Sequence, residues 1–368
     1  MRALKSFRMA DVKNWDVIVI GAGLIGVSLA IELRKHGAAA LVVERGEPGR
    51  EASQAAGGML VDCPWETRAP LQALASASAR MYPEFAYELE VESGMKVDLR
   101  DQGTILFLSA EDRAAAGELP TAKLDELDPA LTESGIHDEA VYLKERSVDP
   151  RALVAAAIKT AEHRGVDFSS GDAVTGISFS DGRTSGITTT KTSFLAGKVV
   201  NCAGAWSGTI GPHPLPTRPV KGQMLCLAMP SRTLLKHVVR SPKAYLIPRS
   251  DGRLLVGATV EEAGFDKRTV PETIQRLHHA ALELVPKLRE ARILEDWAGL
   301  RPGTPDGLPI LGPTEHPGYF VATGHFRDGI LLAPVTARVM STVIEGGKPE
   351  FDLRAFAVDR FGGPCAAA

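Results

Sequence analysis

Two side chains in the second half of the chain could together hold a carboxylate. In EDWAGLR (Glu295–Arg301), the alternation of a strand places Trp297 and Arg301 on one face, and Tyr245 shares a face with Arg249 in a predicted hairpin. The planar fork of an arginine holds a carboxylate through two parallel hydrogen bonds, and a tyrosine hydroxyl could add a third. An ordinary surface ion pair is the alternative role for Arg301.

A glycine pattern near the N-terminus indicates a dinucleotide site. GAGLIG places Gly21, Gly23 and Gly26 in the G-x-G-x-x-G spacing. The first glycine allows a tight turn, the second lets a pyrophosphate approach the backbone, and the third lets a helix pack closely on a strand. Glu44 ends the next predicted strand, where it would meet a ribose hydroxyl. A glycine-rich turn without a ligand is the alternative.

Two further stretches favour FAD over NAD as the dinucleotide. EASQAAGGML (Glu51–Leu60) has small residues that let the backbone approach a bulky planar ring, and its Ser53 and Gln54 offer hydrogen bonds. NCAGAWSG (Asn201–Gly208) brings small residues to the end of a buried strand, which in a parallel sheet faces the ligand crevice. For the first stretch, a flexible loop without a ligand is the alternative.

GHFRDGILLAP (Gly324–Pro334) predicts a strand end, a short loop and the start of a helix. The helix has apolar residues every four positions from Leu331 to Val343, so we expect it to be buried along one wide face. Its N-terminus would direct a partial positive charge into the crevice, which suits a reduced, anionic flavin. The alternative is a core helix without a chemical role.

Hydrophobic periodicity predicts the elements that position these residues. Strands at 16–20 and 39–44 flank a helix at 25–35, and this βαβ unit implies a parallel sheet. Ser250-Asp251-Gly252 separates two apolar runs and indicates a hairpin within 244–259. The other expected elements are an antiparallel strand at 103–109, buried strands at 197–204 and 318–324, and helices at 151–164 and 273–284.

The expected fold class is α/β, with a Rossmann-like FAD-binding domain on a parallel sheet and a discontinuous α+β substrate domain on a largely antiparallel sheet. The FAD-binding domain would comprise residues 15–85, 147–215 and 297–361. The substrate-binding domain would comprise residues 86–146 and 216–296. We expect residues 1–14 and 362–368 to be flexible termini, and we expect no signal peptide.

Composition excludes several classes of protein. The net charge of −3 gives no electrostatic footprint for nucleic acid. The uncharged segment Val17–Ile31 is too short to span a bilayer. Four scattered cysteines without a C-x-x-C pair argue against a zinc site and fit a reducing, cytoplasmic setting. His278 and His279 have no third ligand at metal spacing, so we expect no metal. The sequence contains no G-x-S-x-G elbow, which argues against a serine hydrolase.

The motif set resembles the D-amino-acid oxidase-like FAD flavoproteins, and within them the bacterial glycine oxidases of thiazole (thiamine) biosynthesis. The resemblance runs from about Asp16 to Phe361 and rests on these stretches in the same order: GAGLIG, AAGGML, VKGQML, IPRSDGRLLVGAT, WAGLRPGTPDGLPILG and GHFRDGILLAP. It implies FAD bound without a covalent bond and a homo-oligomer, either a tetramer or a dimer.

The resemblance also implies roles for individual residues. Arg301 would bind the substrate carboxylate beside Tyr245, Arg327 would help to close the site over the flavin, and Val174 would lie near the adenine. The FAD contacts that it implies, together with those expected from the stretches above, are Gly21, Gly23, Ile25, Gly26, Glu44, Arg45, Ser53, Gln54, Gly57, Gly58, Met59, Val174, Ala203, Gly204, Trp206, His325, Phe326, Arg327, Asp328, Gly329, Ile330 and Leu331.

Some positions depart from the family pattern. Asp328 stands where relatives often carry asparagine, which adds an acid near the flavin. Val260 and the run Val61–Cys63 differ in size or charge from the residues expected there, so the preferred amine is left open. No cysteine lies in the 301–334 region, which argues against the covalent tether of related sarcosine oxidases.

The predicted reaction is oxidative deamination of glycine or another small amino acid, such as sarcosine or a small D-amino acid. Hydride would leave Cα for flavin N5, the imine would hydrolyse to a 2-oxo acid and ammonia, and oxygen would reoxidise the flavin to give H₂O₂. The neutral amine reacts, so the rate should rise with pH. Two alternatives stay open: a D-amino-acid or sarcosine dehydrogenase that reduces a quinone, and a flavin-binding module without turnover.

Overall fold

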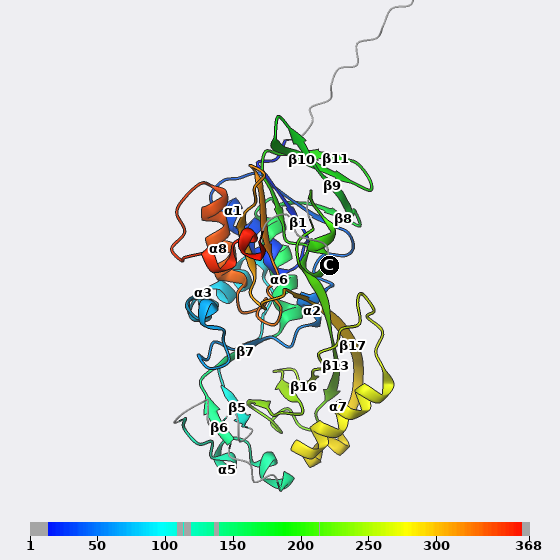
Figure 1. Cartoon of the computed structure of the whole chain (residues 1–368). Coiled ribbons are helices and arrows are strands. Elements are labelled where there is room, and N and C mark those ends of the chain that lie inside the picture. The colour runs from blue at the N-terminus through cyan, green and yellow to red at the C-terminus, as the bar shows by residue number, and fades with distance from the viewer. Residues whose placement is uncertain (1–13, 109–112, 114–118, 136–139, 213, 363–368) are drawn as a thin grey trace, which may run out of the picture.

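The computed structural model of the chain describes residues 14–108, 113, 119–135, 140–212 and 214–362. The molecule is elongated, with α1, α8 and β1 in one lobe and β5, β6 and α7 in the other (Figure 1). The predicted flexible termini lie outside the described residues, apart from residues 14 and 362.

A six-stranded sheet forms the centre of the first lobe. Strands β19, β12, β1, β2 and β8 run parallel, and β18 at the edge pairs antiparallel with β19. The sheet is therefore mixed at one edge, where the sequence predicted a parallel sheet. In spatial order its strands are β18 (Ile310–Pro313), β19 (Tyr319–Thr323), β12 (Val199–Asn201), β1 (Val17–Ile20), β2 (Ala40–Glu44) and β8 (Asp167–Ser170).

Strand β1 is apolar at every position because both faces of the sheet are covered. Val17 and Val19 pack into the core that the helices form. Ile18 and Ile20 pack on the opposite face against the three-stranded sheet of β9 (Val174–Ser180), β10 (Arg183–Thr189) and β11 (Ser193–Leu195). A continuous apolar run of this kind is typical of a parallel strand buried on both faces.

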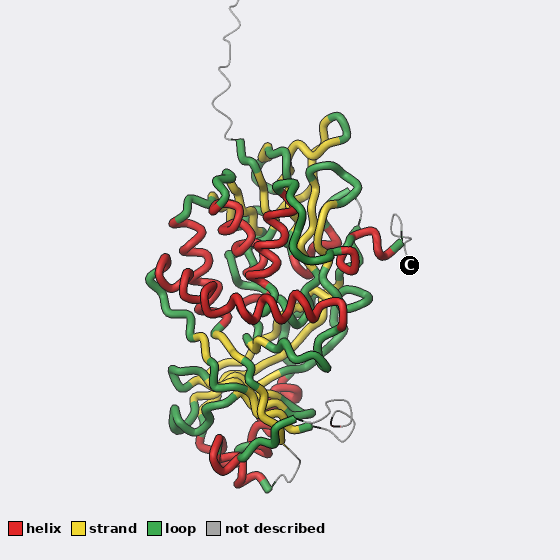
Figure 2. The backbone as a smooth tube through the Cα atoms, turned by 90° about the vertical axis from the view of Figure 1, so that its left-hand side faces the viewer, coloured by secondary structure: helices red, strands yellow, loops and turns green. Residues whose placement is uncertain are grey.

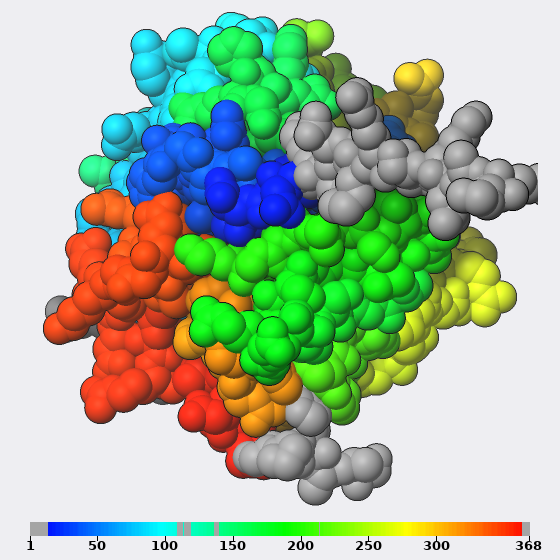
Figure 3. Space-filling view, turned by 90° about the horizontal axis from the view of Figure 1, so that it is seen from above, coloured from blue at the N-terminus to red at the C-terminus, as the bar shows by residue number. Residues whose placement is uncertain are grey.

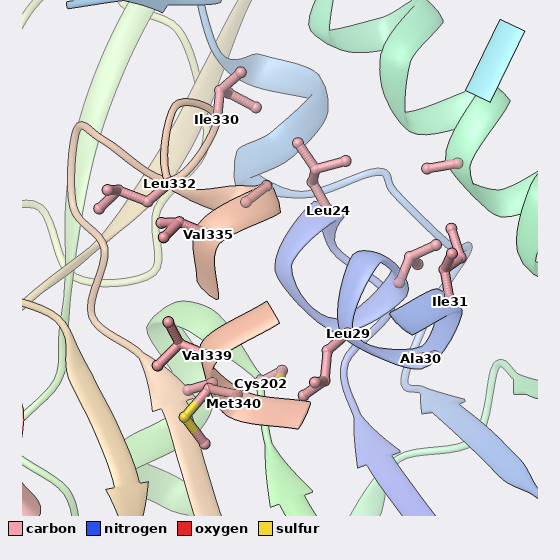
Figure 4. Close-up of a cluster of buried hydrophobic side chains, with 14 of the residues drawn as sticks. Leu24, Leu29, Ala30, Ile31, Cys202, Ile330, Leu332, Val335, Val339 and Met340 are labelled. Carbon is pink, nitrogen blue, oxygen red and sulfur yellow. The ribbon is translucent and has the colours of Figure 1, made fainter. Parts of the chain in front are cut away.

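Four helices form a layer on the first face: α1 (Leu24–Lys35), α3 (Gln72–Ser93), α6 (Pro150–His163) and α8 (Ala333–Ile344). Figure 2 shows this layer beside the strands of the upper lobe. Leu24 and Leu29 of α1 and Val335 and Val339 of α8 belong to one hydrophobic cluster, so the first and last helices of the chain pack together (Figure 4). A further single-turn helix, α2 (Ala52–Ala55), precedes the glycines of AAGGML.

A seven-stranded sheet dominates the second lobe. It is antiparallel except for the parallel pair β14–β5. In spatial order its strands are β17 (Arg292–Gly303), β13 (Arg218–Ala228), β16 (Arg253–Gly257), β15 (Tyr245–Pro248), β14 (Val238–Arg240), β5 (Thr104–Phe107) and β6 (Ala140–Leu143).

The two faces of this sheet pack into different hydrophobic clusters. One face packs on α7 (Pro271–Leu284), with Leu225, Leu246 and Leu277 in a common core. The opposite face carries a smaller cluster that includes Met224, Ile247 and, partly buried, Tyr245. Strand alternation thus separates the residues that hold the sheet together from those that face the first lobe.

Short elements connect the two lobes and close the chain. A three-stranded sheet of β3 (Met59–Leu60), β7 (Arg146–Val148) and β4 (Leu99–Arg100) lies where the lobes meet, and helix α5 (Leu124–Leu127) lies at the far end of the second lobe. The short 3-10 helices span Ala69–Leu71, Pro129–Ser134, Gly204–Thr209, Pro286–Glu290, Arg354–Phe356 and Val358–Phe361.

Each predicted strand and helix has a counterpart in the structure, and the hairpin is the β15–β16 pair. The strand predicted to be antiparallel at 103–109 is β5, which pairs antiparallel with β6 but parallel with β14, and Ser109 lies outside the described residues. Segments from the start, middle and end of the chain lie side by side on one face of the first lobe (Figure 3). The domain boundaries stay a proposal, and β17 continues without a break through the domain boundary predicted at residue 297.

In the described part of the chain, every helix is too short or too polar to cross a bilayer.

Candidate active site

A cavity of about 1130 Å³ lies where the two sheets meet. Four parallel strands of the first sheet reach it with their carboxyl ends, through Ile20, Glu44, Cys202 and Thr323. In open α/β sheets, ligands bind in the crevice outside these strand ends. The second sheet contributes the opposite wall with the face that carries Tyr245.

The glycines of GAGLIG shape the first end of the cavity. Gly21 has a φ of +102°, which side chains rarely adopt, and a Cβ there would lie 2.6 Å from the carbonyl oxygen of Cys202. Gly23 precedes α1 at the cavity wall, and its Cβ would meet Ser53 Oγ at 3.3 Å. Ser53 Oγ accepts a hydrogen bond from the Leu24 N–H at 3.0 Å. A bare backbone at a helix N-terminus fits a pyrophosphate.

Glu44 is anchored beside this glycine turn. Its Oε2 accepts a hydrogen bond from the Ala22 N–H at 2.9 Å, and its Oε1 accepts one from the Gly46 N–H at 3.0 Å. The carboxylate is buried yet lines the cavity. Its remaining lone pairs could accept hydrogen bonds from ribose hydroxyls, as the spacing after GAGLIG predicts.

Stacked side chains close the same end of the cavity from both lobes. The Arg45 guanidinium lies 3.5 Å from the centre of the Trp206 ring, and Trp206 stacks on Phe265 at 5.2 Å. Glu51 pairs with Arg45 at 2.8 Å and with Lys267 at 3.1 Å. The loop that follows β16 therefore reaches across from the second lobe to the dinucleotide end.

Arg301 and Tyr245 stand together at the other end. The Nη1 of Arg301 donates hydrogen bonds to the carbonyl oxygens of Thr259 at 3.1 Å and Lys221 at 3.4 Å. A Cβ at Gly222 would lie 2.6 Å from Arg301 Cζ, so the guanidinium rests directly on this glycine. The Tyr245 hydroxyl lies 3.8 Å from Met224 Sδ. The carbonyls hold Nη1, and the Tyr245 side chain is also hydrogen-bonded to the guanidinium. The remaining donors of the fork are available to a ligand.

Among the described residues, the Arg301 guanidinium forms no ion pair, although the more distant charge of Glu261 raises its pKa. Burial lowers the pKa of Arg301, the positive charge of Arg327 lowers it further, and Tyr245 opposes both effects. Burial raises the pKa of Tyr245, although Arg301 favours its ionised form. No carboxylate forms an ion pair with Arg301 among the described residues. A substrate carboxylate would supply the missing negative charge.

The loop before α8 adds a neutral histidine and an acid. Burial lowers the pKa of His325 to about 3, so its ring is uncharged at physiological pH, and its Nε2 lies 3.1 Å from Thr336 Oγ1. Burial raises the pKa of Asp328 to about 6, and the positive charges of Arg327 and Arg68 lower it. His325 is therefore no proton carrier near neutral pH, whereas Asp328 changes its charge there.

Most of the predicted site residues line this one cavity. They are Gly21, Gly23, Ile25, Glu44, Arg45, Ser53, Gly57, Gly58, Met59, Val174, Ala203, Gly204, Trp206, Tyr245, Arg301, His325, Phe326, Arg327, Asp328, Gly329 and Ile330. They come from segments far apart in the sequence, so the tertiary fold brings them together.

Three predicted contacts lie outside the lining of the cavity. Gly26 faces the carbonyl oxygen of Gly21, so its small size serves the packing of α1. Gln54 is turned away because α2 presents its neighbours instead. Leu331 is buried in the core of the first lobe, because α8 begins only at Ala333 and the preceding turn points this side chain inward.

The sequence did not single out one arm of the cavity. Its lining includes Trp65–Arg68, Leu106–Leu108 and Arg240–Pro242. Arg240 pairs with Glu66 at 2.7 Å and with Glu145 at 3.4 Å, which ties the loop after β3 to β14. No sequence motif identifies these three stretches, because they come from separate segments of the chain and are joined only in the folded structure, in part by the ion pairs of Arg240.

Comparison with known proteins identifies the family. Residues 16–342 match the DAO family, described as FAD dependent oxidoreductase. The chain belongs to this family. The predicted resemblance is confirmed, FAD is the cofactor, and the glycine cradle and the strand ends described above fit it.

Several members of the DAO family resemble the chain over nearly its whole length. A glycine oxidase of Pseudomonas putida is 32% identical, over 92% of this chain and 96% of the relative. The bifunctional protein ThiO/ThiG of Synechocystis is 36% identical over 94% of this chain, which matches 54% of that longer protein. The crystal structure of glycine oxidase from Geobacillus kaustophilus superposes with a TM-score of 0.89 at 32% identity, covering 94% of this chain and 99% of the other. Together they support FAD-dependent amino acid oxidation and an α/β FAD-binding fold.

Proposed function

We propose that this DAO family member oxidises glycine or another small amino acid at Cα. The substrate and oxygen would yield an imine and H₂O₂, and water would convert the imine to a 2-oxo acid, glyoxylate from glycine, and ammonia. The observation that carries the proposal is the half-buried Arg301 fork beside Tyr245, without an ion-paired carboxylate among the described residues and in the same cavity as the dinucleotide turn.

The side chains bind and orient the substrate in this proposal. Arg301 would hold the carboxylate through its free guanidinium nitrogens, and the Tyr245 hydroxyl would add a third hydrogen bond. Bound FAD would accept the hydride from Cα. With its pKa lowered to about 3, His325 is too weak a base to take a proton from the substrate ammonium near physiological pH, and we expect the neutral amine to react. Activity would then rise with pH.

The width of the site bears on the choice of amine. Val61, Val260 and Met224 line the cavity together with the apolar arm at Leu106–Leu108. These apolar side chains could contact a small apolar substituent on the amine. We therefore include sarcosine, D-alanine and D-proline with glycine as candidate substrates.

Other aspects of the function are also proposals. Oxygen as electron acceptor, a homo-oligomer and a cytoplasmic location are consistent with relatives called glycine oxidase. A place in thiazole synthesis is supported by the likeness to ThiO/ThiG proteins. Turnover without peroxide would instead favour the dehydrogenase alternative.

The test is a substrate panel read in two ways. Each amine is mixed anaerobically with the holoenzyme while the absorbance of oxidised flavin is followed, and peroxide and 2-oxo acid are measured under air. Glycine or another small amino acid should bleach the flavin and release peroxide and 2-oxo acid in equal amounts. If no amine bleaches the flavin, the proposed function is wrong and a binding module becomes the better account.

A further inference from the structure

Arg249 is a buried cation that the proposed function does not use. It follows β15, is 1% exposed and lies outside the lining of the cavity. Its Nη2 donates a hydrogen bond to the carbonyl oxygen of Gly57 at 2.6 Å. Its Nε and Nη1 have no hydrogen-bond partner among the described residues. Burying a charged group with so few hydrogen-bond partners lowers the stability of the folded protein, so we infer that the bond to Gly57 has a role that offsets this loss.

The acids near Arg249 are engaged by other groups. Asp149 pairs with Arg253 at 2.6 Å, and Asp98 accepts a hydrogen bond from the Ser250 side chain at 2.5 Å. Burial lowers the pKa of Arg249 to about 10, although the charges of Asp149 and Asp98 raise it. The guanidinium therefore stays charged near neutral pH, and its side-chain hydrogen bond goes to Gly57 of the other lobe.

The segment that Arg249 contacts lines the cavity and is predicted from the family resemblance to contact FAD. Gly57 and Gly58 both line the cavity. The Gly58 carbonyl oxygen accepts a hydrogen bond from the Val148 N–H at 2.8 Å, which fixes the segment to its own lobe. Arg249 holds the preceding carbonyl from the opposite lobe. The two glycines are thus clamped between β7 and the hairpin of the second sheet.

The same hairpin face carries the substrate tyrosine. Tyr245, Ile247 and Arg249 alternate along the chain and so share a side of the sheet. A Cβ at Gly57 would lie 2.7 Å from Ile247 Cδ1 and 3.4 Å from Tyr245 Cε2. All three side chains therefore meet Gly57, and only Arg249 does so through a hydrogen bond.

We propose that Arg249 is a positioning residue: its hydrogen bond to the Gly57 carbonyl holds the cofactor-facing glycine segment at a fixed place relative to Tyr245. It acts on FAD through Gly57 and Gly58, and it needs no contact with the substrate. Removal of this bond frees the segment from the hairpin, so the flavin would bind more weakly and in a less uniform environment. The effect does not depend on which amine is oxidised.

The test compares R249M and R249K with R253M. Arg253 lies on the same hairpin, and its side chain pairs with Asp149 and Asp251 rather than with the glycine segment, so R253M is the matched control. FAD affinity is measured by titrating apoprotein, and the visible spectrum of bound flavin is recorded. R249M should bind FAD about tenfold more weakly and show a shifted or broadened flavin spectrum. R249K keeps a charged donor and should recover most of the affinity.

The control should behave differently. R253M should lose thermal stability while its FAD affinity and flavin spectrum stay at wild-type values. If R249M is insoluble, R249Q replaces it with the same expected result. Wild-type affinity and spectrum in the neutral variant, equal losses in R253M, or no recovery in R249K would each overturn the proposal. These readouts need no substrate, so they are independent of the substrate panel.

Discussion

Arg301 places a permanent positive charge in the cavity, where two backbone carbonyls and the Tyr245 side chain are its hydrogen-bond partners among the described residues. Arg327 adds a second positive charge close enough to lower the pKa of Arg301. A carboxylate ligand would relieve this repulsion and complete the hydrogen bonding of the fork. At the scale of single residues, these charges support the proposal that the site binds an anion.

Arg301→Ala should weaken substrate binding and leave FAD bound. A charge-assisted hydrogen bond contributes about 1.5–3 kcal/mol, so kcat/KM should fall roughly 10- to 100-fold, mainly through KM. Steady-state kinetics and an FAD titration of the variant measure the two effects. Arg301→Lys keeps the charge without the fork and should lie between wild type and alanine. Unchanged kinetics in both variants would assign Arg301 a structural role.

Asp328 should make stability depend on pH. Its pKa in the folded protein, about 6, exceeds the ordinary value of about 4, so the folded state binds more protons than the unfolded state between these values. Stability linked to this group is thus present below pH 4 and is lost as the pH rises through 6. Asp328→Asn should remove that loss and gain about 1–2 kcal/mol at pH 8 relative to wild type.

Thermal unfolding of wild type and D328N at pH 5 and pH 8 checks this sign. The gain in Tm of the variant should be larger at pH 8. An equal gain at both pH values would mean that the carboxylate is not destabilised by burial. Asp181→Asn, at an exposed turn of the first lobe, is the control and should show no pH-dependent difference.

At the scale of elements, the pairing of β13 with β17 builds the substrate end. Their register sets Gly222 opposite Gly299 and Val220 opposite Arg301. These long strands run from the second lobe toward the first, so the end that bears Arg301 reaches the cavity (Figure 1). The missing side chain at Gly222 provides the space over which the guanidinium lies.

Gly222→Ala should therefore displace Arg301. A new Cβ would lie 2.6 Å from Cζ, and the guanidinium would have to move. We expect KM to rise about tenfold while the FAD content stays normal, since one hydrogen-bonded contact is weakened. Gly176→Ala on β9 is the matched control, because its Cβ would meet no atom within 4 Å. Wild-type KM in G222A would show that Arg301 does not need this contact.

At the scale of the whole molecule, the cavity joins two lobes with separate cores. One wall holds the dinucleotide turn at Gly21, and the other holds Tyr245 and Arg301. A bound ligand that contacts both walls stabilises both lobes together. FAD should thus act on the stability of the entire chain, and its release should loosen the junction.

FAD should raise the Tm of apoprotein by several degrees, since a ligand at 100 times its Kd stabilises the folded state by about 2.7 kcal/mol.

Acid precipitation of the holoenzyme should leave the flavin in the supernatant, because we predict non-covalent binding. Cys63, Cys202 and Cys226 are buried, and burial raises their thiol pKa values, which disfavours reactive thiolates. Flavin that remains with the pellet would contradict this prediction.

Local patterns predicted much of the fold. GAGLIG and the apolar runs beside it identified the β1–α1–β2 unit, and Ser250-Asp251-Gly252 identified the β15–β16 hairpin. Local patterns were less informative about orientation. Gln54 and Leu331 belong to stretches that meet the cavity, yet both lie outside its lining, because neighbouring side chains in the short helix α2 and in the turn before α8 point in different directions.

The sequence by itself determined the dinucleotide turn, the buried strands, the hairpin and the family, because each depends on residue types at short spacings that backbone geometry translates directly into structure. Only the tertiary structure decided which side chains meet. Gly222 lies under Arg301 through strand register, Arg240 reaches Glu66 across the two lobes, and Arg249 holds Gly57 from the opposite lobe. Such contacts join segments far apart in the chain, and their geometry follows from the packing of both sheets.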